Sequence, residues 1–154
     1  MRFLIALALF ASADVASATA DAIDNALPKD CDASADAGLS HCAELAFEKA
    51  DAELNEVWKQ VMAKFDAKVD PNSPSALQGP EGQTPEQAAD WMTKWKAALV
   101  DAQKTWAEFK DKDCNGALSY EHMGGTGTGY AVTNCLYDYT VARTEDLKGR
   151  YLSD

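Results

Sequence analysis

The sequence offers few of the groups that catalysis or metal binding needs. Its 154 residues include two histidines, His41 and His122, and neither a G-x-S-x-G nor an H-E-x-x-H motif. A hydrolase triad therefore has few members available. The many Asp and Glu residues fall mostly on polar helix faces, where solvation keeps their acidity ordinary. No C-x-x-C spacing occurs, which disfavours zinc. We expect no enzyme, no cofactor and no metal centre.

Positive charge is also scarce. The chain has 14 Lys and Arg residues against 25 Asp and Glu residues, a net charge of −11. Nucleic acids and anionic membranes would repel such a chain, so neither is expected as a partner. A cationic protein partner is favoured instead. The alternative, that the acidity only keeps the protein soluble, stays open.

Long apolar runs are missing except at the start of the chain. The apolar stretch Phe3–Phe10 follows Arg2 and precedes Ala18-Thr19-Ala20, which has the A-x-A form of a signal-peptidase site. This pattern predicts a signal peptide over residues 1–20, cleaved near Ala20, and a periplasmic or secreted protein. The stretch is shorter than the roughly 18 to 20 residues of a membrane span. With no cysteine at the cleavage point, we expect no lipid anchor.

Cysteines are few but even in number. The four are Cys31, Cys42, Cys114 and Cys135. In an oxidising compartment an even set indicates two disulfides, which allow three connectivities. We prefer Cys31 with Cys42 and Cys114 with Cys135, because each pair is close in sequence. The sequence alone leaves the three connectivities open.

The hydrophobic pattern of the remaining sequence is mainly helical. After an irregular lead-in over 21–40, broken by Pro28 and Gly38, Ser40 is a plausible N-cap for a helix over about 41–68. A connection rich in proline and glycine follows. Thr84 then precedes Pro85 and Gln87 in the order of a capping box, which predicts a second helix over about 85–112.

A third helix is predicted over about 130–151, and no segment alternates with period two. The expected fold is all-α: two long antiparallel helices with a third packed against them, a disulfide-stapled three-helix bundle over 41–154. The four tryptophans are first interpreted as core residues, and an aromatic stripe for binding requires that some be exposed.

The helices also carry short motifs in a fixed order. These are Cys42-Ala43-Glu44, Ala50-Asp51-Ala52-Glu53-Leu54-Asn55, Ala102-Gln103-Lys104-Thr105-Trp106 running to Cys114, Gly124-Gly125-Thr126, Cys135, and Thr140-Val141-Ala142-Arg143-Thr144 with Leu147. This order, over about 42–152, resembles the LprI-type lysozyme-inhibitor family of small exported bacterial proteins. The resemblance implies an all-helical extracytoplasmic domain and, as in the name-giving member, inhibition of a c-type lysozyme. That member is a lipoprotein, whereas this chain lacks the lipidated cysteine.

Five of the residues in these motifs form a candidate polar cluster: Asp51, Asn55, Gln103, Trp106 and Arg143. Asp51 and Asn55 share a helix face, and Gln103 and Arg143 can face them from the other two helices. We favour a buried network that fixes register, in which Asp51 is the carboxylate for Arg143. The alternative is a ligand pocket in which Arg143 grips a carboxylate beside a Trp106 wall.

Two further stretches remain as candidates. Residues 111–122 follow an EF-hand calcium loop through Asp111, Asp113 and Asn115, but position twelve is His122. An extracytoplasmic calcium or small-ligand module is therefore the alternative function. The glycine-rich turn at Gly124, Gly125, Thr126 and Thr128 is instead a candidate loop for entering a partner's cleft.

Overall fold

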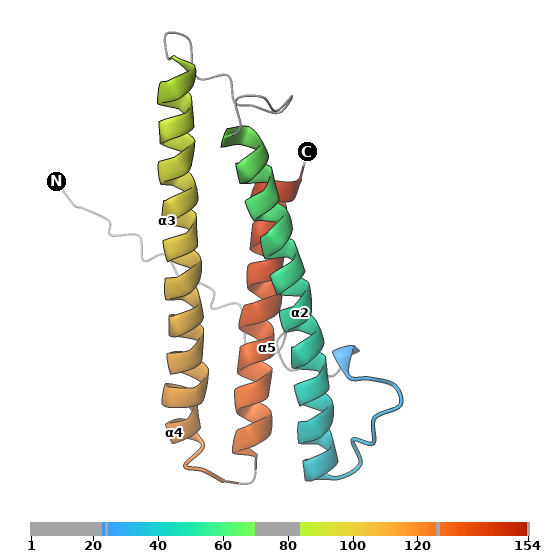
Figure 1. The fold of residues 1–154 in the computed structure, drawn as a ribbon. Helices are drawn as coiled ribbons and strands as arrows, with labels where there is room; N and C mark the ends of the chain where they lie inside the picture. The colour runs from blue at the N-terminus through green and yellow to red at the C-terminus, as the bar shows by residue number, and fades with distance from the viewer. Residues whose placement is uncertain (1–22, 24, 70–83, 126, 154) are drawn as a thin grey trace, which may run out of the picture.

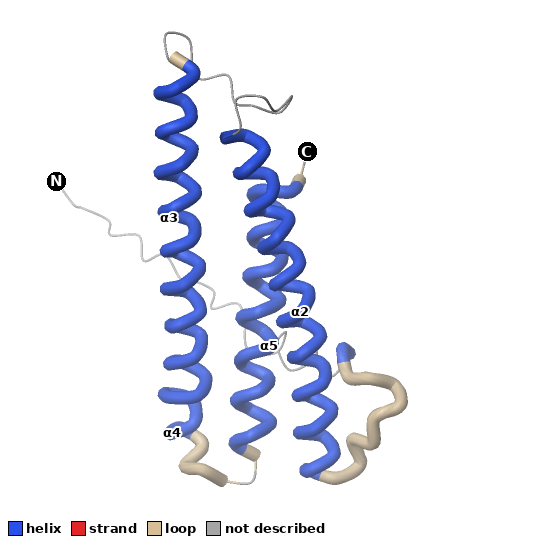
Figure 2. The backbone as a smooth tube through the Cα atoms, in the orientation of Figure 1, coloured by secondary structure: helices blue, strands red, loops and turns tan. Residues whose placement is uncertain are grey.

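The computed structural model describes residue 23 and residues 25–69, 84–125 and 127–153. Its α-helices are α2 (Asp36–Val69), α3 (Pro85–Asp111), α4 (Ser119–Glu121) and α5 (Thr128–Leu147), and its π-helical turns are η1 (Lys112–Leu118) and η2 (Lys148–Leu152). No strand occurs within the described ranges (Figure 2). The predicted all-α bundle is confirmed. The expected signal peptide lies outside the described residues.

The three long helices lie side by side along one axis. In Figure 1, α2 and α5 run in the same direction and α3 runs opposite to both. The start of α2, the end of α3 and the start of α5 therefore meet at one end of the bundle. Among the described residues, no helix has enough length and apolar character to cross a bilayer.

Helix α2 begins at Asp36, inside the segment predicted as an irregular lead-in. Gly38, predicted to be a helix breaker, lies in its first turns. A Cβ added at Gly38 would lie 2.1 Å from the carbonyl oxygen of Asp32. The missing side chain thus lets the preceding turn pack directly on the helix, and glycine serves here for close approach rather than to end a helix.

Helix α3 begins as predicted. The Thr84 hydroxyl accepts a hydrogen bond from the Gln87 amide at 3.3 Å, and the Thr84 amide donates to the Gln87 side chain at 2.9 Å. This capping box satisfies donors that a helix N-terminus leaves free. At its other end α3 passes directly into η1 and then α4, so helical backbone continues to Glu121, beyond the predicted end at 112.

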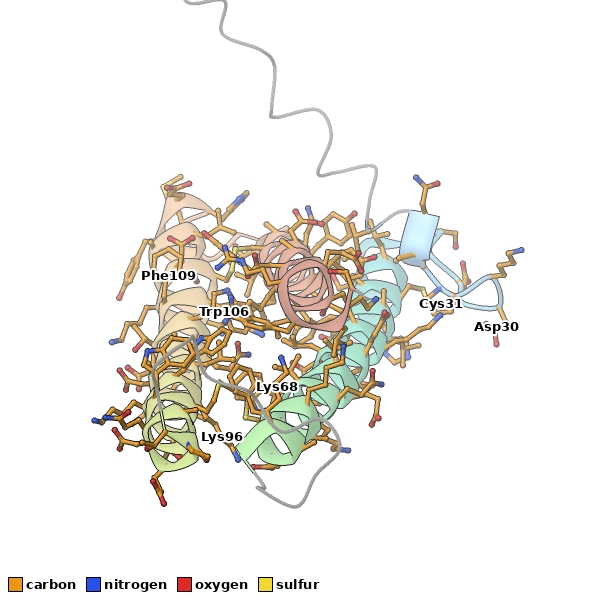
Figure 3. The ribbon with its side chains drawn as sticks, turned by 90° about the horizontal axis from the view of Figure 1, so that it is seen from above. Asp30, Cys31, Lys68, Lys96, Trp106 and Phe109 are labelled. Atoms are coloured by element: carbon orange, nitrogen blue, oxygen red, sulfur yellow. A yellow bond between two sulfur atoms is a disulfide. The ribbon has the colours of Figure 1, made fainter. Side chains whose placement is uncertain are left out.

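The core lies between the inner faces of α2, α3 and the last turns of the chain. Its buried residues are Leu54, Val57, Val61, Phe65, Met92, Leu99 and Leu147. Trp58 and Trp106 pack against this cluster, as predicted. Seen along the bundle, Trp106 points into the space between the helices (Figure 3). Trp91 and Trp95 are instead exposed, so the prediction that all four tryptophans are core residues is wrong.

Both preferred disulfides are present. Cys31 bonds to Cys42, and Cys114 bonds to Cys135, with a Cα–Cα distance of 5.7 Å in each pair. The first fastens the segment before α2 to that helix. The second joins η1 to α5. Since α2 begins and α3 ends at the same end of the bundle, both cross-links act there.

Candidate functional site

The predicted polar cluster divides into two groups. In the first, Arg143 of α5 donates from Nε to the Gln103 side chain of α3 at 2.8 Å and from Nη1 to Asp146 at 2.8 Å. Asp146 also pairs with the exposed Arg150 at 2.6 Å. The carboxylate partner of Arg143 is therefore Asp146, and the expectation that Asp51 fills this role is wrong. Asp146 lies three residues from Arg143 on the same helix, a spacing at which two side chains are neighbours on the helix surface.

In the second group, Asp51 accepts a hydrogen bond from Asn55 at 3.0 Å and lies 3.8 Å from the ammonium of Lys110. Lys110 also donates to the Thr140 hydroxyl at 3.0 Å. Burial lowers the pKa of Lys110, and the charges of Asp51 and Asp111 oppose that shift. Sequence reasoning missed Lys110, although it lies four residues from Trp106 on the same face of α3.

Trp106 lies between the two groups. Its ring centre is 5.0 Å from the Lys110 ammonium and 5.9 Å from the Arg143 guanidinium. Cations at these distances are attracted by the electron-rich face of an indole ring. The cluster thus links α2, α3 and α5 through polar groups that bind one another, an arrangement suited to holding the helices in register.

The calcium-like stretch is helical. Asp111 and Asn115 bond to each other at 2.8 Å, while Asp113 accepts a hydrogen bond from the Tyr139 hydroxyl at 2.7 Å. Within the described part of the chain, no group of three His, Cys, Asp or Glu side chains is placed to hold a metal ion. The sequence match to a calcium loop therefore does not correspond to a loop conformation, because residues 112–118 form η1.

Two large exposed side chains lie at the turn between α4 and α5, Tyr120 in α4 and Met123 just after it, and we call this pair the apolar tip. Their exposed fractions are 85% and 91%. Positive φ angles at Met123 (50°) and Gly124 (68°) reverse the chain here. Gly124 and Gly125 are exposed, Thr126 lies outside the described residues, and the Thr128 hydroxyl is buried. Sequence reasoning located the turn but missed the two large side chains beside it.

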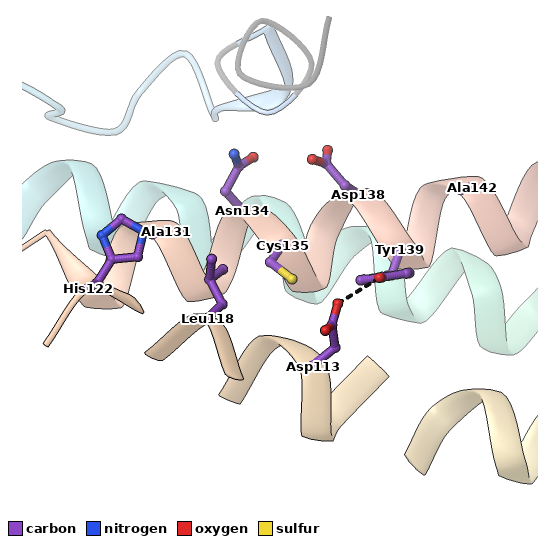
Figure 4. A pocket seen from close by; sticks show the side chains of 9 residues that line it. All are labelled: Asp113, Leu118, His122, Ala131, Asn134, Cys135, Asp138, Tyr139 and Ala142. Carbon is purple, nitrogen blue, oxygen red and sulfur yellow. Dashed lines mark hydrogen bonds between the residues drawn. The ribbon is translucent and has the colours of Figure 1, made fainter. Parts of the chain in front are cut away.

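Next to the tip, a trough runs along α5. Its volume is about 560 Å³, and its lining residues are Asp113, Leu118, His122, Ala131, Asn134, Cys135, Asp138, Tyr139 and Ala142. Figure 4 shows Asn134 and Asp138 pointing to the same side of α5, while Asp113 reaches Tyr139 from η1. The disulfide at Cys135 forms part of the wall. We call this region the acidic trough.

The trough places negative charge where water is partly excluded. Burial raises the pKa of Asp138, and no cation in the described ranges pairs with this carboxylate. The pKa of neighbouring Tyr137 is raised by burial and by the charges of Asp138 and Glu53. The hydrogen bond to Asp113 raises the pKa of Tyr139. The side-chain oxygen of Asn134 is buried and has no hydrogen-bond partner. A cationic or hydrogen-bond-donating group would satisfy this set.

Comparisons with known proteins identify the family. The family model described as lysozyme inhibitor LprI matches residues 29–147. An uncharacterised protein of Rhizobium meliloti (strain 1021) is 30% identical over 110 residues, which cover 71% of this chain and 69% of that protein. No solved structure matches. The chain therefore belongs to the LprI family of lysozyme inhibitors.

Proposed function

We propose that this protein is an exported, non-enzymatic inhibitor that docks on a cationic lysozyme-like enzyme through the apolar tip and the acidic trough. The observation that carries the proposal is their adjacency. His122, which lines the trough, lies in sequence between Tyr120 and Met123, so the two features form one continuous surface. The family match supports a lysozyme as the target class.

The trough would receive a Lys or Arg side chain of the enzyme. Desolvation without a partner makes the ionised form of Asp138 less favourable than in water. A cation that arrives at this position stabilises the carboxylate and makes a charge-assisted hydrogen bond with it. The net charge of −11 would steer the encounter, which predicts association that slows as salt rises.

The tip would supply buried apolar area. Large exposed side chains at a turn contribute to binding when they fill a pocket of the partner. The Cys114–Cys135 disulfide ties η1 to α5 on either side of this turn. A segment held in its bound shape loses less conformational entropy on docking. The same disulfide therefore supports both the trough wall and the position of the tip. A periplasmic or secreted location fits the two disulfides.

The test is an activity assay of a c-type lysozyme with the mature protein. The variants are Tyr120→Ser with Met123→Ser, and Asp138→Asn. Each is expected to raise the inhibition constant at least about tenfold. Val100→Ser removes an exposed apolar side chain from α3, and Glu56→Gln removes an exposed carboxylate from α2, so both serve as matched controls and should have little effect.

An unrelated acidic protein of similar net charge is the control for charge alone. If it inhibits as well as the wild-type protein, or if the tip and Asp138 variants inhibit unchanged, the proposal is wrong.

A small-ligand module is the second candidate, favoured by the volume of the trough. About 560 Å³ falls within the roughly 300–1,000 Å³ typical of ligand pockets. Its acidic lining selects small organic cations. Thermal unfolding with and without arginine amide tests this function, since a ligand that binds the native state raises the melting temperature. Calcium with and without chelator tests the metal alternative in the same assay.

A further inference from the structure

Helix α3 carries a mostly apolar, exposed seam along one edge of the face that packs into the bundle. Its members recur at spacings of four, three, four, three and four residues, and all are exposed: Trp91, Trp95, Ala98, Ala102, Thr105 and Phe109. The exposed fractions of Trp91 and Phe109 are 54% and 52%. This outer seam is about 27 Å long at 1.5 Å per residue. The alternating spacing is the one that two packed helices use.

The seam borders the face of α3 that packs into the bundle. The ring centre of Trp95 lies 4.9 Å from that of Phe65 in α2, and that of Phe109 lies 5.7 Å from that of Tyr139 in α5, so both side chains have one edge against the bundle and one edge exposed. The inward-facing residues are Ala88, Met92, Leu99, Gln103, Trp106 and Lys110. The outer seam is displaced from them around the helix. Its tryptophans contact each other, with ring centres of Trp91 and Trp95 5.2 Å apart. Large apolar side chains that stay about half exposed in a line along a helix are typical of an interface.

We propose that the outer seam pairs with that of a second copy of this chain in an antiparallel homodimer. The seam is large at both ends and small in the middle. An antiparallel copy places Trp91 against Phe109, and Ala98 against Ala102 at the twofold axis. The alanines let the two helices approach closely while the aromatic side chains pack at each end. A parallel copy would set Trp91 against Trp91 and leave the ends unequal in size.

Charges beside the seam fit the same arrangement. Lys94 and Glu108 flank it on the side away from the bundle. With Ala98 set against Ala102, Lys94 of each copy faces Glu108 of the other, which gives two ion pairs between copies. In the single chain these groups make only exposed pairs, Lys94 with Asp90 at 2.7 Å and Glu108 with Lys104 at 4.0 Å. Both are therefore available to a partner.

One charge opposes the pairing. Asp101 lies midway between Lys94 and Glu108 and faces its own counterpart across the axis. A helix pair about 27 Å long and ~10 Å wide buries at most several hundred Å² per copy, at the low end for specific interfaces. The expected dimer is therefore weak, with a dissociation constant on the order of micromolar.

The test is sedimentation equilibrium of the mature protein. Ala98→Glu places a charge at the centre of the seam, whereas Ala97→Glu places the same charge one residue away at an exposed position outside it. We expect Ala98→Glu to raise the dimer dissociation constant at least about tenfold and Ala97→Glu to leave it nearly unchanged. Asp101→Asn should strengthen the dimer.

Charge reversal provides a readout that loss of folding would not mimic. Lys94→Glu alone and Glu108→Lys alone should each weaken the dimer, while the double variant restores it because opposite charges again face each other. A wild-type protein that stays monomeric at about 1 mM, well above this range, overturns the proposal, and so does a dimer that ignores Ala98→Glu. Lysozyme inhibition by Ala98→Glu should be unchanged. If it is lost, the seam holds the enzyme rather than a second copy.

Discussion

The Nε atom of Arg143 donates to the Gln103 side chain at 2.8 Å and thereby joins α5 to α3. The Arg143 side chain is only 14% exposed, and Asp146 satisfies its charge from the same helix. A buried guanidinium requires such partners, because leaving it unpaired would cost several kcal/mol. The bond therefore acts as a register contact between two helices that the hydrogen bond from Lys110 to Thr140 also joins.

The first prediction compares the two arginines that share Asp146. Arg143→Ala should lower the free energy of unfolding by about 2–3 kcal/mol, because it removes packing and leaves Gln103 without its partner. Arg150→Ala removes an exposed pair and should cost less than about 1 kcal/mol. Urea denaturation measures both. Equal costs would show that the interhelical bond contributes nothing beyond a surface ion pair.

The second prediction concerns Asp138. Its pKa is raised above the ordinary value of 3.8, so the native state binds the proton more readily than the unfolded chain. The contribution of Asp138 to stability is therefore most favourable below 3.8, becomes less favourable as pH rises through the folded-state pKa, and stays so at neutral pH. The Asp138→Asn variant cannot ionise at this position, so its free energy of unfolding does not include this decrease.

Asp138→Asn should consequently be more stable than wild type at pH 7, by less than about 1 kcal/mol because solvent screens the partly exposed group. Unfolding free energies measured from pH 3 to pH 7 give the comparison. A variant that is less stable at pH 7 and inhibits lysozyme normally would show that Asp138 has a structural role only.

The third prediction separates the two disulfides. Removing either should destabilise the protein by about 3 kcal/mol, since the cross-linked residues are 11 and 21 apart and the loop entropy grows slowly with length. Only the Cys114→Ser and Cys135→Ser double variant should also weaken lysozyme inhibition, measured where both variants remain folded. Similar inhibition by the two double variants would argue against a tip held in place by the Cys114–Cys135 bond.

The fourth prediction concerns Lys110, whose ammonium lies 5.0 Å from the ring centre of Trp106 while burial disfavours its charge. Lys110→Met keeps most of the packing and should cost less than about 1 kcal/mol, whereas Lys110→Ala should cost about 2–3 kcal/mol. Denaturation at pH 7 provides the measurement. Should both variants cost the same, the hydrogen bond to Thr140 would be the main contribution of this residue.

Burial also makes the contribution of Lys110 to stability depend on pH. Because the folded-state pKa of Lys110 is lowered, the unfolded chain binds more protons than the folded protein at pH values between that pKa and 10.5. Its contribution to stability should therefore increase as pH rises through the folded-state pKa towards 10.5. In Lys110→Met this increase should be absent.

Several features followed from local sequence alone. The 3.6-residue period predicted three helices and the absence of alternation predicted no sheet in the part of the chain that the structure describes. The Thr84 capping box needs only residues three apart, and both cysteine pairs are near neighbours in sequence. Each of these signals depends on contacts within a few turns of chain, which is why a linear reading was sufficient for them.

Other features depended on how the helices rotate against one another. Periodicity placed Trp91 and Trp106 in one apolar set, yet packing left the first exposed and put the second between two cations. Likewise, spacing could not select Asp146 over Asp51 for Arg143, nor bring Asp113 to Tyr139 beside Asp138. The sequence determined which segments are helical, because that choice is local. The tertiary structure decided which charges meet and which apolar faces remain open, because both depend on the relative rotation and register of whole helices.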